Sequence, residues 1–400
     1  MQSESATGTR PAWPPFIRHV EAEPPYGLAD AGTDIAFAMT GDVYRNVRAL
    51  KQIRSLAARG HSVTALSLAG DAPPIALPDA VRVRTMPFPA GSGPGWFLDV
   101  HRGMRDMLSM LRPRHVHASD LYVLPACAAH ARAGSRRLSY DARELYPHVA
   151  STAGKPWSTW FWRLLEGYYI RRAHTVFTVS NRIADHLAKM YAIPRPTIIF
   201  NAPDVRIPPT VRTDIRSTIG LDSTVPLVVH AGQIRAGRGV DLLVGALPMM
   251  PHIHVALLGY GPAVEDMREL ARAQGTASRL HVLEPVSPMD VPFFIRTADV
   301  GVTLLDDSCL NHRYALPNKL FDYFAAGLPV VASDLPEIMD VLRRFKAGIA
   351  ARPGTDQLGQ AILDVIRNPE PFRDGARAAS SIFNWEAVEP EFCAAFQPRT

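Results

Sequence analysis

The sequence is poor in cysteine and lysine, and it has no long apolar run. Three cysteines among 400 residues are too few and too far apart for a disulfide framework or a zinc site. No window approaches the roughly 18 uninterrupted apolar residues that a membrane-spanning helix needs. The net charge is only +5, well below the charge density of a dedicated nucleic-acid binder. We therefore expect neither a metal nor a nucleic acid as a partner.

The first 33 residues differ in composition from the rest of the chain. They hold five prolines and four acidic residues, but no apolar segment of the kind a signal peptide requires. We predict that residues 1–33 form a flexible leader on a cytoplasmic enzyme.

From residue 34 onward, short apolar runs alternate with amphipathic stretches, a pattern typical of parallel sheets. A polar, proline-marked segment near residue 205 interrupts the alternation, which then restarts. A single core rarely exceeds roughly 250–300 residues, so the length also favours two domains. The sequence predicts an α/β protein with doubly wound domains at 34–205 and 206–378, and a final segment at 379–400. Ligands bind beyond the carboxyl ends of such strands, so a cleft between the domains is the expected site.

Eleven short apolar runs carry this prediction. The predicted strands are 35–39, 62–68, 115–118, 137–140, 175–179 and 197–200 in the first domain, and 226–230, 254–258, 280–283, 300–304 and 329–332 in the second.

The segment Leu316–Gly327 has the start and stop signals of a helix, with Pro317 at its predicted first position and Gly327 just past its end. A helix N-terminus attracts anions. Lys319, one of only five lysines, stands in the first turn, where a cation opposes the helix dipole unless a phosphate lies between them. Asp322, one turn later, is placed to accept hydrogen bonds from vicinal hydroxyls. The alternative is an ordinary capped helix with a solvated Lys–Asp pair.

A second candidate site is the glycine-rich segment 231–239, between a predicted strand and a predicted helix. Glycines let the backbone approach a ligand, and Arg235 and Arg238 have the spacing to clamp a diphosphate. The Gly-Lys-Ser/Thr ending of a P-loop is absent. The alternative is a surface turn with solvated arginines. Segment 257–263 lacks one glycine of a dinucleotide-binding motif, and we interpret it as a tight turn.

Polar residues also follow the predicted strands of the first domain. We interpret them as the lining of the cleft, with turn and capping roles as the alternative. Asp306 and Asp307 have no further carboxylates at metal-ligand spacing, so we predict no metal site there. The residues of the first domain are Gly41, Asp42, Arg48, His117, Asp141, Arg143 and Glu144.

The stretch 157–170 is unusually aromatic, and two interpretations of it remain open. It fits a core helix whose C-terminal Arg171 and Arg172 suit the helix dipole. It also fits a helix that rests on a membrane surface, because three of the six tryptophans fall within six residues. The residues at helical spacing are Trp157, Trp160, Phe161, Leu164, Leu165 and Tyr168.

Taken in order, these motifs resemble family 4 of the glycosyltransferases, retaining enzymes of the GT-B fold. The most specific stretch is 316–337, and the resemblance covers roughly residues 34–390. Weaker agreement comes from 41–48, 60–63, 117–120, 140–145, 179–180, Asn201, 238–239, 258–262, 298–300 and 383–386.

The resemblance implies a role for each candidate residue. Two Rossmann-like domains would face each other across a cleft, the first binding the acceptor and the second the nucleotide sugar, with a C-terminal helix crossing back to the first domain. Arg238, Lys319 and Arg235 would be the catalytic cations at the donor diphosphate, and Asp322 would hold the ribose. Tyr314 and Arg143 stand where family members often carry Glu and His. Further donor contacts would come from Gly232, Gln233, Gly259, Pro317, Asn318, Leu320 and Glu337, and acceptor contacts from the residues of the first domain named above.

The resemblance thus implies a retaining, metal-independent hexosyltransferase that needs no cofactor. It would move a sugar from a UDP- or GDP-sugar to a glycan or lipid-linked acceptor in surface polysaccharide or glycoconjugate synthesis, in the cytoplasm or as a peripheral protein at the inner face of the membrane. Retention in this family is attributed to same-face attack, with the leaving phosphate taking the acceptor's proton. Two alternatives remain: a sugar-nucleotide epimerase, and a non-catalytic nucleotide-sugar-binding subunit, the latter favoured by the departures at Tyr314 and Arg143.

Overall fold

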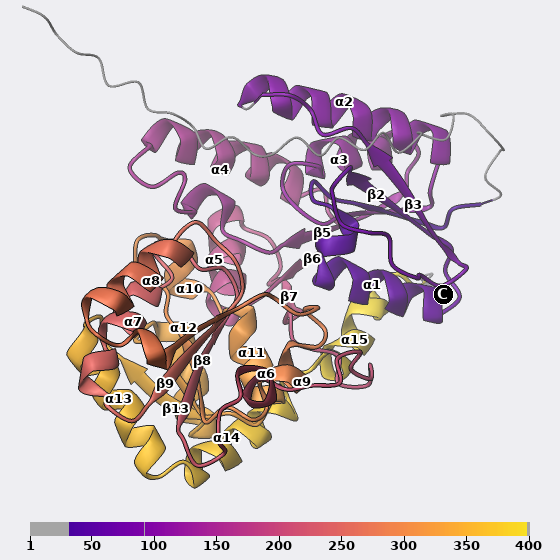
Figure 1. The fold of residues 1–400 in the computed structure, drawn as a ribbon. Coiled ribbons are helices and arrows are strands. Elements are labelled where there is room, and N and C mark those ends of the chain that lie inside the picture. Colours follow the sequence, from indigo (N-terminus) through magenta and orange to yellow (C-terminus); the bar gives the residue numbers. More distant parts are fainter. Residues whose placement is uncertain (1–31, 92, 398–400) are drawn as a thin grey trace, which may run out of the picture. The chain divides into compact units, whose positions relative to one another are not determined.

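The computed structural model describes residues 32–91 and 93–397 (Figure 1). The predicted leader lies outside the described residues, apart from its last two positions. Two parallel sheets follow one another along the chain, and we call the parts built on them the first and second domains.

The first domain contains a seven-stranded sheet in the order β3-β2-β1-β4-β5-β6-β7, and all its strand pairs are parallel. Its strands are β1 (Ile35–Ala38), β2 (Val63–Leu68), β3 (Val81–Met86), β4 (His115–Ala118), β5 (Arg137–Ala142), β6 (Thr175–Thr178) and β7 (Thr197–Ile198). Its helices are η1 (Val43–Arg45), α1 (Val47–Ala58), α2 (Pro94–Leu111), α3 (Leu124–Ala133), η2 (Tyr146–His148), α4 (Pro156–Ile170) and α5 (Asn181–Tyr191).

The second domain contains a six-stranded parallel sheet in the order β10-β9-β8-β11-β12-β13. Its strands are β8 (Leu227–Ala231), β9 (His254–Leu258), β10 (Leu280–Leu283), β11 (Val300–Thr303), β12 (Val330–Ser333) and β13 (Gly348–Ala351). Its helices are α6 (Ile215–Ile219), α7 (Val240–Gly245), η3 (Leu247–Met249), α8 (Val264–Ala273), η4 (Ala277–Arg279), α9 (Val291–Ile295), α10 (Leu310–Tyr314), α11 (Asn318–Ala325), α12 (Pro336–Phe345), α13 (Thr355–Arg367) and α14 (Glu370–Ser380), with α15 (Trp385–Ala394) after them.

The strand order reverses between β1 and β4 in the first sheet and between β8 and β11 in the second. The prediction of two doubly wound Rossmann-like domains is therefore confirmed. In such sheets, ligands bind beyond the carboxyl ends of the strands where the order reverses. The segments that follow β8 and β11 are thus the first place to look for a site.

The sequence missed two strands, and both lie at sheet edges. In β3 the sequence is VRVRTM, so arginines alternate with apolar residues as on a half-solvated strand. In β13 the four residues GIAA are too short and too small to stand out from a loop. The predicted strands correspond to the interior strands and to β7 and β10, within two residues at either end.

Side chains of β1 alternate between two cores, one on each face of the first sheet. Ala36 and Ala38 belong to the core under α2, α3 and α4, whereas Ile35 and Phe37 belong to the core that α1 and α15 cover. Trp385 at the start of α15 is fully buried there, and its Nε1 donates a hydrogen bond to Ser55 Oγ at 2.9 Å. The C-terminal helix therefore crosses back to the first domain, as predicted.

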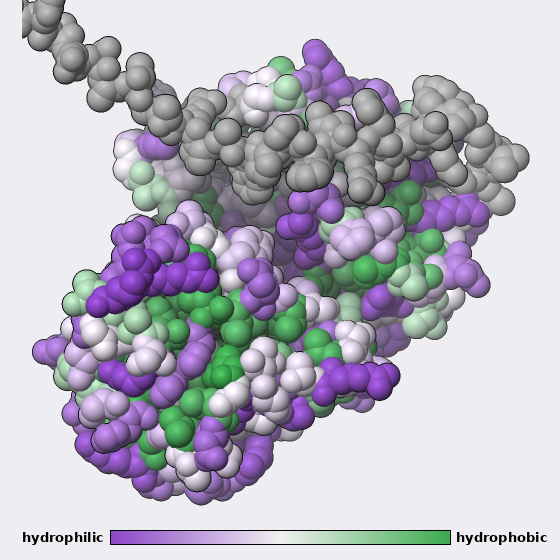
Figure 2. Space-filling view, in the orientation of Figure 1, coloured by the Kyte–Doolittle hydropathy of each residue, from purple (hydrophilic) through white to green (hydrophobic). Residues whose placement is uncertain are grey.

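The helices over the second sheet are amphipathic, as their position between core and solvent requires. On α8, for example, Met267 and Ala271 are buried while Glu265 and Arg268 are exposed. Figure 2 shows the hydrophilic outer surface that α8 gives to this part of the second domain.

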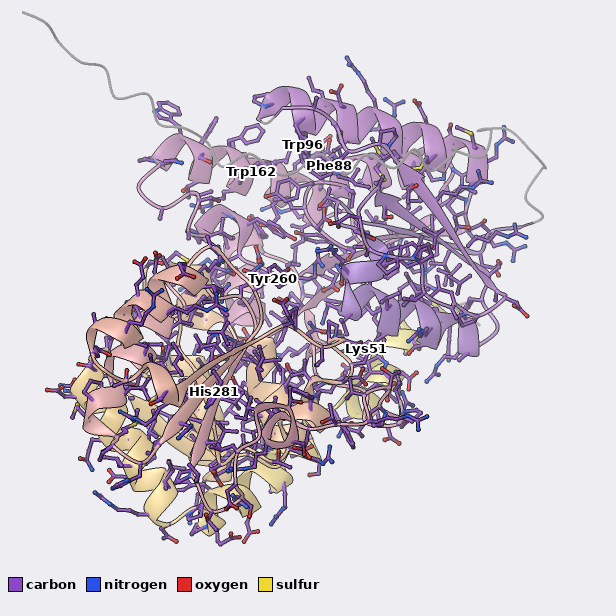
Figure 3. The ribbon with its side chains drawn as sticks, in the orientation of Figure 1. Lys51, Phe88, Trp96, Trp162, Tyr260 and His281 are labelled. Atoms are coloured by element: carbon purple, nitrogen blue, oxygen red, sulfur yellow. The ribbon has the colours of Figure 1, made fainter. Side chains whose placement is uncertain are left out.

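Helix α4 is not the core helix that one interpretation of the sequence predicted. Trp157 is 82% exposed and Trp160 is 56% exposed. Trp162 and Tyr169, on the opposite side, pack against the first-domain core. The Trp162 ring lies 5.3 Å from the ring of Tyr122, near Trp96 and Phe88 (Figure 3).

Candidate functional site

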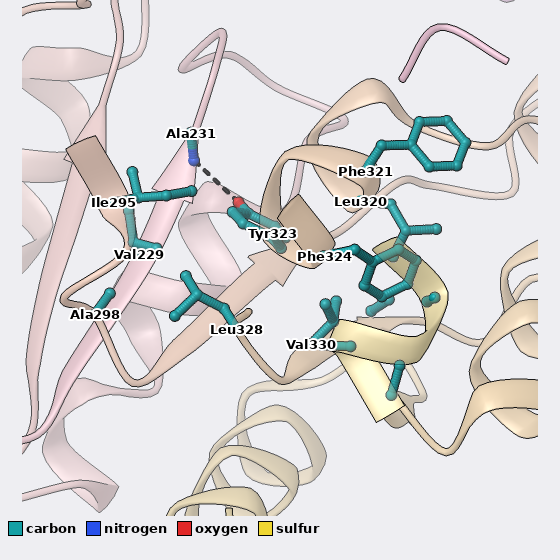
Figure 4. Close-up of a cluster of buried hydrophobic side chains, with 14 of the residues drawn as sticks. Val229, Ala231, Ile295, Ala298, Leu320, Phe321, Tyr323, Phe324, Leu328 and Val330 are labelled. Carbon is teal, nitrogen blue, oxygen red and sulfur yellow. Dashed lines mark hydrogen bonds between the residues drawn. The ribbon is translucent and has the colours of Figure 1, made fainter. Parts of the chain in front are cut away.

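Helix α11 is fixed in place by its apolar side, which leaves its polar residues near the ends of β8 and β11. Leu320, Phe321, Tyr323 and Phe324 are buried in the core of the second domain (Figure 4). The Tyr323 hydroxyl accepts a hydrogen bond from Ala231 N at 3.1 Å and donates one to Val302 O at 2.9 Å. One side chain thus ties α11 to both strands at the point where the sheet order reverses.

The start of α11 differs from the prediction by one residue. Pro317 is the N-cap rather than the first helical residue, and no side chain caps the helix. Lys319 Nζ lies 3.0 Å from His230 Nε2, at the end of β8. Burial and the Lys319 charge hold the pKa of His230 well below its usual range, so a neutral imidazole accepts a hydrogen bond from the lysine.

The glycine-rich segment passes directly beside this lysine. A Cβ atom added at Gly232 would lie 3.5 Å from Lys319 Nζ, in ordinary van der Waals contact, and the φ of +123° at this residue favours glycine. Burial and the Arg238 charge lower the pKa of Lys319 to about 7. The two motifs that the sequence singled out therefore meet at one place.

Arg238 brings a second cation to this place. Burial and the neighbouring Arg235 lower the pKa of Arg238, while Asp306 and Glu144 act in the opposite direction. Within the described part of the chain, neither Arg235 nor Arg238 makes a hydrogen bond or an ion pair through its side chain. Cations that repel one another without partners favour an anion between them.

Asp322 faces a small cavity between the two domains. Burial raises the pKa of Asp322 to about 7, against the opposing charges of Lys51 and Lys319. Lys51, from α1 of the first domain, donates to Ala202 O and lies 5.3 Å from the centre of the Trp385 ring (Figure 3). The cavity has a volume of about 140 Å³, and its lining includes Lys51, Asn201, Asp204, Asn318 and Asp322.

Three of the predicted cleft residues of the first domain do not line a cleft. Arg48 is 3% exposed, and its guanidinium makes two hydrogen bonds to Asp141, at 2.7 and 2.8 Å. Arg48 also donates to Ile199 O, and Gln52 donates to Asp141. His117 is fully buried, and its Nδ1 bonds to Ser139 Oγ at 2.8 Å. Because a buried charge needs a partner, Arg48 and Asp141 neutralise each other inside the first domain and are not available to a ligand.

The other four residues are not buried, and they follow the carboxyl ends of β1 and β5. Gly41 is exposed, and the Asp42 carboxylate accepts from Tyr44 N and Ala72 N. Arg143 is partly exposed, and its guanidinium lies 3.6 Å from the Asp120 carboxylate. Glu144 is exposed, and its negative charge raises the pKa of Arg238. Asp120 is itself held by Thr40 N and Thr40 Oγ1.

Comparisons with known proteins agree with this geometry. The family described as "Glycosyl transferase 4-like domain" matches residues 46–203, and "Glycosyl transferases group 1" matches residues 225–368. The chain belongs to family 4 of the glycosyltransferases. The two matches fall one on each domain, and the GT-B fold is that of two Rossmann-like domains.

Individual relatives of this family 4 glycosyltransferase are distant. D-inositol 3-phosphate glycosyltransferase of Xylanimonas cellulosilytica is 29% identical over 194 residues, which cover 46% of this chain and 45% of that protein. The chain spans about half the length of the curated relatives it matches first.

Solved structures show the same fold at low sequence identity. Sucrose-phosphate synthase from Thermosynechococcus elongatus has a TM-score of 0.75 at 15% identity, over 90% of this chain and 98% of that one. HepE of Anabaena, in complex with UDP and glucose, has a TM-score of 0.70 at 15% identity, with the same coverage.

Three residues predicted to contact the donor make structural contacts of their own, and their contact with a donor stays a prediction. The side chain of Leu320 is fully buried in the second-domain core, and its N–H donates to Pro317 O. A Cβ at Gly259 would lie 2.0 Å from Gly232 O, so glycine at this position lets the two backbone segments approach closely. Glu337 is buried and accepts from Asn181 N at 2.8 Å and Arg182 N at 3.3 Å, so it caps α5 of the first domain.

The remaining family positions are placed as follows. Gln233 and Asn318 are exposed, next in sequence to the cation cluster of Arg235, Arg238 and Lys319. Tyr314 packs against the first-domain core, and its carbonyl accepts from Ser180 Oγ at 2.7 Å, so this departure from the family serves contact between the domains. Sequence reasoning missed His230 and Lys51, and only the rarity of lysine pointed to the latter.

The described residues offer neither a metal site nor a membrane-spanning helix. No group of three or more His, Cys, Asp or Glu side chains there could hold a metal ion, and the Asp306 carboxylate bonds to Ser308 and His312. No helix in that part of the chain is long and apolar enough to cross a bilayer.

Proposed function

We propose that the protein is a retaining, metal-independent glycosyltransferase that moves a hexose from a UDP- or GDP-sugar to a glycan or lipid-linked acceptor. The observation that carries this proposal is the group of Arg235, Arg238 and Lys319 at the carboxyl end of β8, with no carboxylate bonded to any of them among the described residues. A diphosphate is the anion whose size and charge suit three converging cations.

The cations would act on the leaving group. When the bond to the anomeric carbon breaks, negative charge grows on the β-phosphate, and preorganised cations stabilise that charge without having to move. Arg238 and Lys319 would bind its oxygens, with the uncapped N–H groups at the start of α11 beside them. Asp322 in its ionised form would accept hydrogen bonds from the ribose hydroxyls.

The acceptor would enter from the side of Arg143 and Glu144. Glu144 belongs to the first domain, and its charge raises the pKa of Arg238 in the second domain. An acceptor hydroxyl that binds near Glu144 would therefore lie on the same side as the donor phosphate that Arg238 would bind. In the proposed same-face reaction, the departing phosphate oxygen takes the hydroxyl proton as the hydroxyl attacks. The new glycosidic bond forms on the face from which the diphosphate leaves.

The proposal extends to where the reaction takes place. The three cysteines are free, which suits the reducing cytoplasm. A lipid-linked acceptor would bring the protein to the inner face of the membrane, in surface polysaccharide or glycoconjugate synthesis.

A panel of UDP- and GDP-sugars tests the proposal. Nucleoside diphosphate release that depends on an acceptor, unaffected by a chelator and with an unchanged anomeric configuration in the product, is the expected result. Isomerised nucleotide sugar without acceptor would replace the proposal by an epimerase. Donor binding without turnover on any acceptor would replace it by a non-catalytic binding subunit.

A further inference from the structure

A larger cavity, of about 440 Å³, lies where the segment leading into α4 meets the start of α10. None of the described residues that line it is Asp or Glu. Its lining includes His148, Lys155, Trp160 and Arg163 from the first domain and Cys309 and Leu310 from the second. The cavity is therefore basic on one wall and bounded by both domains.

Among the described residues, no carboxylate forms an ion pair with the cations of this cavity. In the described part of the molecule, Lys155 and Arg163 make no ion pair. Burial and the Arg163 charge lower the pKa of His148, so the imidazole is pushed toward its neutral, hydrogen-bonding form. Two free cations beside a polar ring fit a phosphate group.

An apolar surface continues from the cavity along α4. Five of the twelve large hydrophobic side chains that are exposed in the described chain lie on this one helix. They recur at helical spacing, so they form one face, which we call the aromatic face. Trp160 belongs both to this face and to the cavity lining. The aromatic face consists of Trp157, Trp160, Phe161, Leu164 and Tyr168.

Basic residues border the aromatic face. The Arg172 guanidinium lies 3.5 Å from the centre of the Tyr168 ring, and Arg171 follows the last turn of α4. Tryptophan and tyrosine beside arginine are characteristic of helices that lie in the interface of a bilayer. A lipid that carries a phosphate offers both a charge for the cavity and a hydrocarbon for this face.

The cavity also lies close to the proposed reaction centre along the chain. Its first-domain wall begins at Pro147, three residues after Glu144, and its second-domain wall begins at Cys309, three residues after Asp306. Glu144 and Asp306 are the two carboxylates that act on Arg238. Three residues span at most about 10 Å, roughly the length of one or two sugar units.

We propose that this cavity holds the phosphate of a lipid-linked acceptor, whose hydrocarbon lies in the membrane against the aromatic face. The inference rests on the proposed function, because it takes the sugar next to that phosphate to be the group that is glycosylated. It gives the aromatic helix a substrate-binding role in addition to membrane contact.

Flotation with vesicles tests the inference on the full chain. Phosphatidylcholine vesicles with and without phosphatidic acid serve as the probe, and inorganic phosphate as the free-anion arm. We expect the double variant Lys155→Gln/Arg163→Gln to lose about 25-fold in partition onto acidic vesicles, since each basic residue near an anionic surface contributes about fivefold. Trp157→Ser/Trp160→Ser should lose binding to both kinds of vesicle. Hydrogen exchange across residues 147–163 should slow on acidic vesicles.

Two matched controls accompany these variants. Arg343→Gln/Arg344→Gln removes the same charge from α12, and Met249→Ser/Ile382→Ser removes exposed apolar side chains elsewhere. Both should bind vesicles as the wild type does.

Four results would overturn the inference. The first is a wild-type partition onto vesicles that does not depend on phosphatidic acid, and the second is a loss of partition in the control variants equal to that in the test variants. The third is slower hydrogen exchange of residues 147–163 with inorganic phosphate alone. The fourth is a wild-type dimer that the Trp157→Ser/Trp160→Ser variant converts to monomers. UDP and GDP binding, measured in the same samples, should be unchanged in all variants. Failure of the proposed function would instead appear as loss of nucleotide binding in the wild type.

Discussion

Replacement of Arg238 by alanine isolates the contribution of the cation cluster to transfer. The side chain is partly buried and makes no ion pair within the described chain, so no structural bond is broken by its removal. A hydrogen bond between a charged side chain and a phosphate contributes about 1.5–3 kcal/mol. The Arg238→Ala variant should therefore lose about tenfold to 150-fold in kcat/KM for the nucleotide sugar.

The same change has an opposite effect on the free protein. Arg235 and Lys319 are repelled by the Arg238 charge, so its loss relieves repulsion that no ligand compensates. The thermal midpoint of the ligand-free variant should be equal to that of the wild type or higher. Stabilisation by added UDP or GDP should be smaller, because the ligand binds the folded state less tightly.

Steady-state kinetics and thermal unfolding, run on the same preparation, separate these effects. Arg268→Ala on α8 is the matched control, because Arg268 makes only an exposed ion pair with Glu265. Unchanged kcat/KM in the Arg238 variant would refute the assignment of the site. Lost activity together with a clearly lower thermal midpoint would also refute it, since the residue would then be structural.

Three further predictions concern charged groups at defined positions. The affinity for UDP or GDP should fall as the pH rises through about 7, because the Lys319 amine of the free protein then loses a proton that it keeps when a phosphate is bound. Calorimetry at a series of pH values checks this. The Lys319→Met variant should lose this pH dependence, which distinguishes the effect of Lys319 from that of Asp322, whose pKa is also about 7. Arg48→Met should lower the free energy of unfolding, measured in urea, by about 3–5 kcal/mol, because Asp141 is left buried without its partner. The double variant Arg48→Met/Asp141→Leu should be more stable than Arg48→Met alone, and equal or lower stability would contradict this explanation. Glu337→Gln should cost about 1 kcal/mol of unfolding free energy, because the amide can accept only one of the two backbone hydrogen bonds from Asn181 and Arg182. Nucleotide affinity should be unchanged, and a large loss of affinity would return this residue to the donor site.

The sequence predicts strands well where packing demands continuous apolar residues. Interior strands such as β9 are covered on both faces, and their apolar runs stand out. Edge strands have neighbours on one side only, so β3 tolerates arginines and β13 a glycine. Tertiary position, which the local sequence does not record, decides how apolar such a strand is.

The same limit explains which predicted site residues the structure brings together. Lys319 and Arg238 each belong to a motif that is continuous in sequence and directly follows or precedes a recognisable element. The Arg48–Asp141 pair joins residues 93 positions apart, and nothing near either residue reveals that the other neutralises it. The aromatic face of α4 has the periodicity of a buried stripe, and only the structure shows that no part of the described chain covers it.

The alternation along α11 explains how a second domain that stays folded can hold mutually repelling charges. Leu320, Phe321, Tyr323 and Phe324 face the core, and the Tyr323 hydroxyl fixes the helix against β8 and β11. Lys319 and Asp322, three residues apart, project on the other side. Burial of the apolar side offsets the cost of burying the Lys319 amine beside Arg238, and both of these effects lower its pKa. A bound diphosphate would compensate the charges of Lys319 and Arg238. Donor affinity and thermal stabilisation by the donor should therefore rise and fall together across variants of these residues.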